Sequence, residues 1–257
     1  MFFCGKYGDQ CLSAPFRTLL PAFILPLVLL ILPNRQSTLL PVSDALYGVG
    51  FVTLVFINGI SRRLSINNAF MTAALLLVFY GIWRIELYGT QLDTAMDNAL
   101  GEMNNLFPAV VNSVEFEKTV QIMKFMMPSI WIGTQVLGLF IGLLLFQRKL
   151  GLPFKLQEFT VSKYYSLVII ALIPLYFYEK ALPIMANALF GLSTVLFLQG
   201  LGVAVAKGLQ LISNKLILTV LLVFLIFNVV SYLILVLIGF ADQWLNFRKI
   251  ETGGTPA

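Results

Sequence analysis

The sequence predicts an all-α fold, a polytopic transmembrane helix bundle with about seven spans. Of its 257 residues, 59% are hydrophobic and only 11% are charged, whereas soluble domains carry about 45–50% apolar and about 25% charged residues. The apolar residues also form continuous runs, and a helix needs about 20 of them to cross the hydrocarbon layer. Membrane β-barrels alternate apolar and polar residues, so continuous runs favour helices.

Seven apolar runs are the expected spans, and together they make the chain a single integral membrane domain (1–257). In order, the runs cover residues 16–33, 40–60, 69–88, 126–146, 163–178, 183–206 and 216–241. The first and fifth runs are short, and the first contains Pro21 and Pro26.

Basic residues follow the even-numbered spans. The loops after spans two, four and six contain Arg62, Arg63, Arg148, Lys149, Lys155, Lys163, Lys207 and Lys215. Because cytoplasmic loops are enriched in lysine and arginine, we expect these loops and the N-terminus on the cytoplasmic side of the membrane. Seven spans would leave Arg248 and Lys249 outside. Either this tail is an exception or one N-terminal span is re-entrant or split.

The longest stretch between spans, residues 89–125, has helical spacing of its apolar residues and an acidic opposite face. This pattern is typical of an amphipathic helix. We expect it outside the membrane, between spans three and four, with a break near Pro108. Two roles are open, a cap that shields helix ends and a lid over a binding cavity.

Composition excludes several classes of function. The chain has no histidine, which excludes His-based catalytic triads, His metal sites and His haem ligation. The carboxylates are scattered and not paired, so we expect no enzyme activity, no metal site and no cofactor. The net charge of +5 is explained by topology, and no basic–aromatic stretch suggests nucleic-acid binding.

Four amides inside the apolar runs are candidate ligand-binding residues: Gln135, Asn187, Gln199 and Asn228. Polar groups inside a membrane are costly and often functional. Hydrogen bonding between helices is the alternative role.

Small residues four positions apart allow helices to pack closely in lipid. This spacing occurs at Gly138 and Gly142 and again at Gly200 and Ala204. We therefore expect close helix contacts at these four positions.

The segment after the last run contains Asp242, Trp244 and Arg248. We expect it to fold back as a short helix at the membrane interface, where aromatic residues are enriched. Asp242 would accept hydrogen bonds from backbone amides at the start of that helix, and Arg248 would contact helix-end carbonyls or an acidic partner. The alternative is a docking site for a partner protein.

An ordered set of motifs covers residues 126–249. The set comprises Met127-Pro128-Ser129-Ile130, Gln147-Arg148-Lys149-Leu150-Gly151, Phe154-Lys155-Leu156-Gln157-Glu158-Phe159, Ala186-Asn187-Ala188-Leu189, Phe197-Leu198-Gln199-Gly200-Leu201-Gly202-Val203-Ala204, and the block 238–249, which runs from Ile238-Gly239 through Asp242 to Arg248-Lys249. This set resembles the YybS-like bacterial membrane-protein family, a family of unknown function.

That family is distantly similar to the substrate-binding membrane components of energy-coupling-factor vitamin transporters. The resemblance implies a helical bundle able to hold a small molecule, located in a bacterial cytoplasmic (inner) membrane. It assigns no binding residues. We therefore expect a small-solute binding or transport component, with a non-catalytic scaffold, assembly or partner-binding protein as the alternative. The expected partners are membrane lipids, other membrane-protein subunits or a small-molecule substrate.

Overall fold

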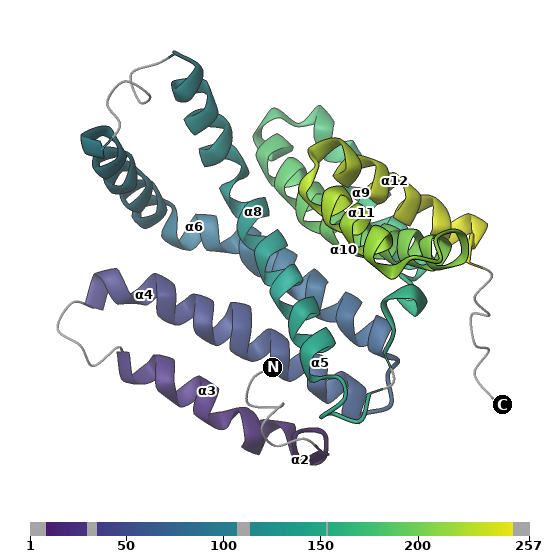
Figure 1. Cartoon of the computed structure of the whole chain (residues 1–257). Coiled ribbons are helices and arrows are strands. Elements are labelled where there is room, and N and C mark those ends of the chain that lie inside the picture. Colours follow the sequence, from purple (N-terminus) through teal and green to yellow (C-terminus); the bar gives the residue numbers. More distant parts are fainter. Residues whose placement is uncertain (1–8, 30–34, 107–113, 153, 249–257) are drawn as a thin grey trace.

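The fold was analysed in a computed structural model, which describes residues 9–29, 35–106, 114–152 and 154–248 (Figure 1). This part of the chain contains helices and no strand, so the all-α class is confirmed for it. The first part of the chain contains α2 (Asp9–Ser13), α3 (Pro15–Leu29), α4 (Arg35–Ser43), the π-helix η1 (Asp44–Phe51), α5 (Val52–Ser61), α6 (Ile66–Leu106) and α8 (Val114–Phe146). The second part contains, in order, the 3-10 helix η2 (Leu156–Glu158), α9 (Lys163–Leu172), the 3-10 helices η3 (Ile173–Phe177) and η4 (Glu179–Ala181), α10 (Leu182–Leu211), α11 (Lys215–Phe227) and α12 (Val229–Leu245).

The predicted number of about seven spans was too high. Among the described residues, the helices long and apolar enough to cross a membrane are four: Leu39–Ser61, Ile66–Leu106, Phe116–Phe146 and Glu179–Leu211. The first and fifth predicted spans are shorter apolar helices, Pro15–Val28 and Lys163–Phe177. Residues 30–33 of the first one lie outside the described residues. The predicted seventh span is two helices, which could cross only as a bent pair.

Asn228 divides that last apolar run. Its side-chain oxygen accepts hydrogen bonds from the backbone N–H groups of Val230 at 2.9 Å and Ser231 at 3.2 Å. This is an N-cap, which satisfies amide groups that a helix start leaves free. α11 and α12 meet there at an angle of 98°. Hydropathy alone merged them, because one amide barely changes the average over a long apolar run.

The break at Asn228 also explains why Arg248, a basic residue, follows the last predicted span. α12 returns the chain toward the loop that follows α8, where the Arg248 guanidinium donates to the carbonyl oxygens of Gln157 and Phe159, each at 2.9 Å. The split lies in the C-terminal span, whereas the sequence had suggested an N-terminal one. Lys249 lies outside the described residues.

Two basic loops meet at one end of the bundle. Asn67, just after the turn of Arg62 and Arg63, donates from its amide to the Thr160 hydroxyl at 2.9 Å. We call this the basic end; it comprises the turn between α5 and α6 and the residues between α8 and α9. A set of phenylalanines joined by edge-to-face contacts, with ring centroids 5.4–6.4 Å apart, packs these loops onto the helices: Phe56, Phe70, Phe140, Phe154 and Phe159.

α6 and α8 form a long antiparallel pair. Phe70 packs on Phe140, and Gly81 lies against Ile132 farther from the basic end. With 41 residues, α6 is about 60 Å long at about 1.5 Å per residue, twice the roughly 30 Å of the hydrocarbon layer. It is kinked at Tyr88 (φ −131°, ψ 16°).

The described residues of the expected insert, 89–125, belong to the end of α6 and the start of α8, so they extend two of the span-length helices. Beyond the Tyr88 kink, residues 89–106 of α6 lie beside the first turns of α8, an arm held by the ion pair between Asp97 and Lys124 at 2.8 Å (Figure 1). A Cβ at Gly89 or Gly101 would meet no heavy atom within 4 Å. Figure 1 shows the arm extending from one end of the bundle, and its role as a cap or a lid stays a prediction. The break expected near Pro108 lies outside the described residues.

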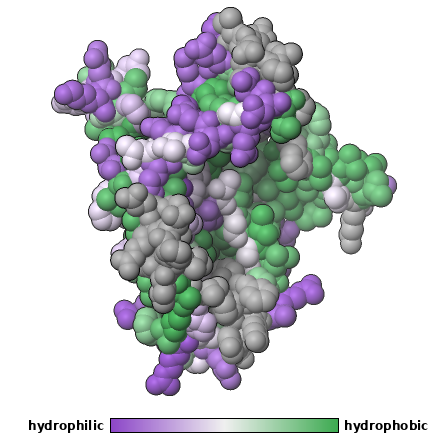
Figure 2. All heavy atoms as spheres, turned by 90° about the vertical axis from the view of Figure 1, so that its left-hand side faces the viewer, coloured by the Kyte–Doolittle hydropathy of each residue, from purple (hydrophilic) through white to green (hydrophobic). Residues whose placement is uncertain are grey.

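The surface has the distribution expected of a membrane protein. Figure 2 shows hydrophilic residues gathered toward the top and bottom of one face, with hydrophobic residues between them. The arm carries acidic residues such as Asp93 and Asp97, whereas the basic end carries exposed arginines such as Arg62 and Arg148. The two ends of the bundle therefore differ in charge as well as in polarity.

We predict that the basic end faces the cytoplasm and the arm faces outward, because positive loops are retained inside. Single cysteines at positions 97 and 148, in a chain with Cys4 and Cys11 replaced, test this in whole cells with a membrane-impermeant thiol reagent. Position 97 should react in intact cells and position 148 only after the membrane is disrupted. The reverse pattern would contradict the orientation.

Candidate functional site

An ion pair joins η1 to α6 inside the first half of the bundle. The Arg84 guanidinium donates from Nε and Nη2 to the two carboxylate oxygens of Asp44, each at 2.8 Å. Exposed fractions of the two side chains are 9% and 20%. The Tyr80 hydroxyl lies 3.0 Å from both Ser43 Oγ and Asp44 Oδ1. Ionisable residues within apolar, span-length helices are costly and are functional-site candidates in membrane proteins.

The π-helix brings an aromatic layer onto this pair. Its Gly48 leaves space for the Trp131 ring of α8, because a Cβ there would lie 2.7 Å from that ring. The ring of Trp131 in turn contacts Tyr80 edge-on at 5.5 Å and lies 5.1 Å from the Arg84 guanidinium. π-Helical turns are rare and frequently occur at functional sites.

A cavity of about 250 Å³ lies next to this layer, between η1, α5, α6 and α8. It is lined by Gly48, Val49, Val52, Thr53, Leu77, Gln135, Gly138 and Leu139. Because Gln135 follows Trp131 by one turn of α8, the aromatic layer lies on the arm side of the cavity. The wall is mostly apolar, with one hydroxyl and one amide, which is the usual make-up of a small-molecule site.

Gln135 differs from the other three candidate amides. Its side chain makes no hydrogen bond within the described part of the chain, and it faces the cavity. Asn187 instead links helices: its oxygen accepts from Ser129 N–H at 3.0 Å, and its amide donates to the carbonyls of Phe125 and Pro183, each at 2.9 Å. Asn228 caps α12, and Gln199 belongs to the network described next.

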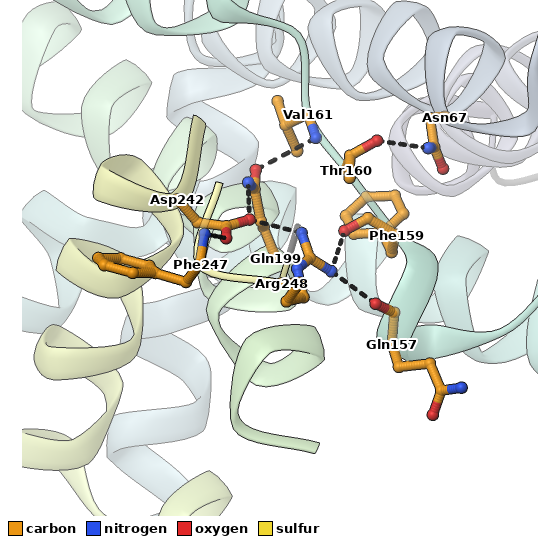
Figure 3. Close-up of polar contacts among 9 residues, drawn as sticks. All are labelled: Asn67, Gln157, Phe159, Thr160, Val161, Gln199, Asp242, Phe247 and Arg248. Atoms are coloured by element: carbon orange, nitrogen blue, oxygen red, sulfur yellow. Dashed lines mark hydrogen bonds and ion pairs between the residues drawn. The ribbon is translucent and has the colours of Figure 1, made fainter. Parts of the chain in front are cut away.

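A buried polar network holds the C-terminal segment (Figure 3). Gln199 on α10 accepts from Val161 N–H at 3.2 Å and donates to Asp242 at 2.8 Å. Asp242 also accepts from Phe247 N–H at 3.0 Å and pairs with Arg248 at 2.5 Å. Both charged side chains are 2% exposed. Gln199, Asp242 and Arg248 bond to one another and to backbone groups, which indicates a structural role for the network.

The fold-back expected for this segment takes another form. α12 continues to Leu245 and ends at Asn246, which is left-handed (φ 44°, ψ 57°). Asp242 therefore lies in the last turn of α12, and it does not begin a new helix. Arg248 reaches backbone carbonyls of the loop before α9, and Trp244 is half exposed beneath Lys163, whose Nζ lies 5.5 Å from the ring.

The four small residues expected at helix contacts have different surroundings. A Cβ on Gly200 would overlap the carbonyl oxygen of Leu235 on α12, so two backbones meet there. Gly142 is buried and Ala204 packs against the core. Gly138 does not make the expected contact, because a Cβ there would meet nothing within 4 Å. It lines the cavity, where the neighbouring helices stand apart.

Three of the motif blocks meet at this network. Gln199 bonds Asp242, and a Cβ on Gly202 would lie 2.6 Å from the Leu156 carbonyl and 3.2 Å from Arg248. Where α10 crosses α12, Gly239 of α12 lies against the carbonyl of Leu196 on α10. Residues 154–159, 197–204 and 238–248 therefore form one packed unit.

Sequence reasoning missed the pairing of Asp44 with Arg84 and the cavity beside it. A signal was present, because Asp44 lies near the start of the second predicted span and Arg84 near the end of the third. Neighbouring antiparallel spans place such residues at the same depth. The chain matches no protein-family model, no curated protein and no solved structure.

Proposed function

We propose that this protein is an integral membrane protein of the bacterial cytoplasmic membrane that binds a small solute in the Gln135 cavity. The observation that carries the proposal is an amide facing an apolar cavity with no hydrogen bond from the described residues. An amide removed from water without a partner costs free energy, and a bound solute with a polar group would remove that cost.

The lining indicates the class of solute. Thr53 and Gln135 provide hydrogen-bond donors and acceptors, and the other lining residues are glycines and aliphatic side chains. The volume of about 250 Å³ is just below the roughly 300–1,000 Å³ of drug-sized ligand sites. We expect a small, uncharged and mostly apolar molecule with one or two polar groups.

A role as a transport component follows from the resemblance of residues 126–249 to the YybS-like family and its distant similarity to energy-coupling-factor subunits. In such a system, the protein should co-purify with a pair of ATPases and a coupling subunit. The non-catalytic scaffold stays the alternative, favoured by the arm, which extends from the bundle and offers a surface to another protein. A scaffold should co-purify with other proteins and without ATPases.

We predict that Gln135→Leu lowers the amount of bound solute about tenfold, because loss of the amide leaves a polar group of the solute unpaired. The protein is purified in native-lipid nanodiscs, and the small molecules released on denaturation are quantified by mass spectrometry. Thr134→Val is the matched control, since Thr134 is exposed on the same helix and its hydroxyl donates to the backbone carbonyl of Trp131 at 2.7 Å.

Two outcomes would contradict the proposal. In the first, no small molecule is enriched over nanodiscs that lack the protein. In the second, Gln135→Leu and Thr134→Val retain equal amounts of solute, which places the molecule elsewhere.

A further inference from the structure

A second depression lies at the basic end, between α6 and α9, with a volume of about 390 Å³. It is lined by Asn68, Met71, Thr72, Leu75, Ser162, Tyr164, Tyr165 and Val168. We call it the α6–α9 groove. Backbone N–H of Ser162 donates to the Met71 sulfur at 3.2 Å, which fixes the start of α9 against α6. The Gln135 cavity lies between η1, α5, α6 and α8, so the groove is a separate site.

Both walls of the groove change from polar to apolar in the same direction. On α6, Asn68 and Thr72 come first and Leu75 follows; on the other wall, Ser162 caps the start of α9 and Val168 follows. The hydrogen bond between Asn67 and Thr160 places the two polar ends side by side. Leu75 and Val168 are exposed, so the apolar end of the groove opens at the outer surface of the helices. A ligand that fits this gradient has a polar head and an apolar chain.

The polar end also has uncompensated positive charge. Arg62 and Arg63 occupy the turn before α6, and Lys163 is the first residue of α9. All three are exposed, and none forms an ion pair within the residues that the structure describes.

Two acidic side chains close to this end, Glu158 and Asp242, already have partners. Glu158 pairs with Lys155 at 2.9 Å, and Asp242 pairs with Arg248. Arg62 and Arg63 precede the polar end of the groove in the chain, and Lys163 lies between the lining residues Ser162 and Tyr164, with its Nζ 5.5 Å from the Trp244 ring. Since no ion pair neutralises these cations within the described residues, they give the polar end a net positive charge.

We propose that the α6–α9 groove binds one anionic phospholipid. Its phosphate would lie at the amide of Asn68 and the hydroxyl of Ser162, near Arg62 and Lys163, and an acyl chain would follow Leu75 and Val168. A soluble anion would leave the apolar half empty, and a neutral lipid would leave the cations unpaired. Basic pockets between helices at the cytoplasmic face are suited to such headgroups.

Native mass spectrometry tests the site after the intact protein is equilibrated with vesicles of equal phosphatidylglycerol and phosphatidylcholine content. The native protein should retain phosphatidylglycerol in preference. The double variant Arg62→Gln, Lys163→Gln should retain about tenfold less phosphatidylglycerol, because each basic residue near an anionic lipid makes a favourable contribution to lipid binding. The matched control is Arg148→Gln, Lys149→Gln, which removes the same charge from an exposed part of the basic end.

A second variant tests the chain-binding half. Leu75→Trp fills the groove from a partly exposed position, so the protein should fold normally and still lose the lipid. The proposal fails if both test variants keep the native preference, or if the control loses as much lipid as the double variant. It also fails if inorganic phosphate alone displaces the bound species, which would indicate a free anion. The Gln135→Leu variant should bind the lipid normally, so this result is independent of the solute site.

Discussion

Replacing Gly200 by alanine is expected to destabilise the protein by about 3 kcal/mol or more, a large value for a single methyl group. The added carbon would overlap the carbonyl oxygen of Leu235, and backbone atoms cannot move aside as a flexible side chain can. The crossing also includes Gly239, whose Cβ would overlap the carbonyl of Leu196. Thermal unfolding in detergent, followed by circular dichroism, measures the effect.

Gly138→Ala is the matched control for this substitution. Both glycines lie inside helices, where alanine is favoured by up to about 1 kcal/mol in intrinsic propensity. Gly138 has nothing within 4 Å of the new carbon, so this variant should be neutral or slightly stabilised. Equal melting temperatures for the two variants would show that α10 and α12 do not meet at Gly200.

The second large effect is expected at the buried ion pair. Arg248→Met should destabilise the protein by about 3–5 kcal/mol, the usual result of leaving a buried charge without its partner. Asp242 would keep the donors Gln199 and the N–H of Phe247. The carbonyls of Gln157 and Phe159 would lose their donor as well.

The double variant Asp242→Leu, Arg248→Met should recover part of this loss, because removing both charges leaves neither uncompensated. Lys155→Met is the exposed control, and it should cost no more than about 1 kcal/mol, since its pair with Glu158 lies at the surface. An effect of Arg248→Met as small as that of Lys155→Met would mean that the C-terminal segment is not held in the bundle.

These two experiments also separate the roles of the motif blocks. If Gly200, Asp242 and Arg248 act in folding, as their burial indicates, their variants should lose stability together. Gln135→Leu should change solute binding without a comparable loss of stability. The ligand site and the packed C-terminal unit would then be distinct parts of the protein.

The sequence alone determined the class of the protein. Its low content of charged residues and its long apolar runs predict helices in a membrane. Only helices and closed β-barrels pair all backbone groups in hydrocarbon, and continuous apolar runs favour helices. The basic loops also marked one end of the bundle. These properties depend on the residue types along the chain. They do not depend on which distant residues are in contact in the folded protein.

The number of spans and the candidate site were decided by the tertiary structure. Asn228 looks like a buried polar residue in a long span, and it became a helix cap because its amide satisfies the start of α12. Gly138 and Gly200 have the same sequence signature, yet only Gly200 has a backbone against it. Gln135 became the candidate ligand residue because the cavity wall contains it, whereas Asn187 and Gln199 met donors and acceptors of neighbouring elements. Which partner each polar group meets depends on contacts between distant parts of the chain, and a hydropathy pattern does not contain them.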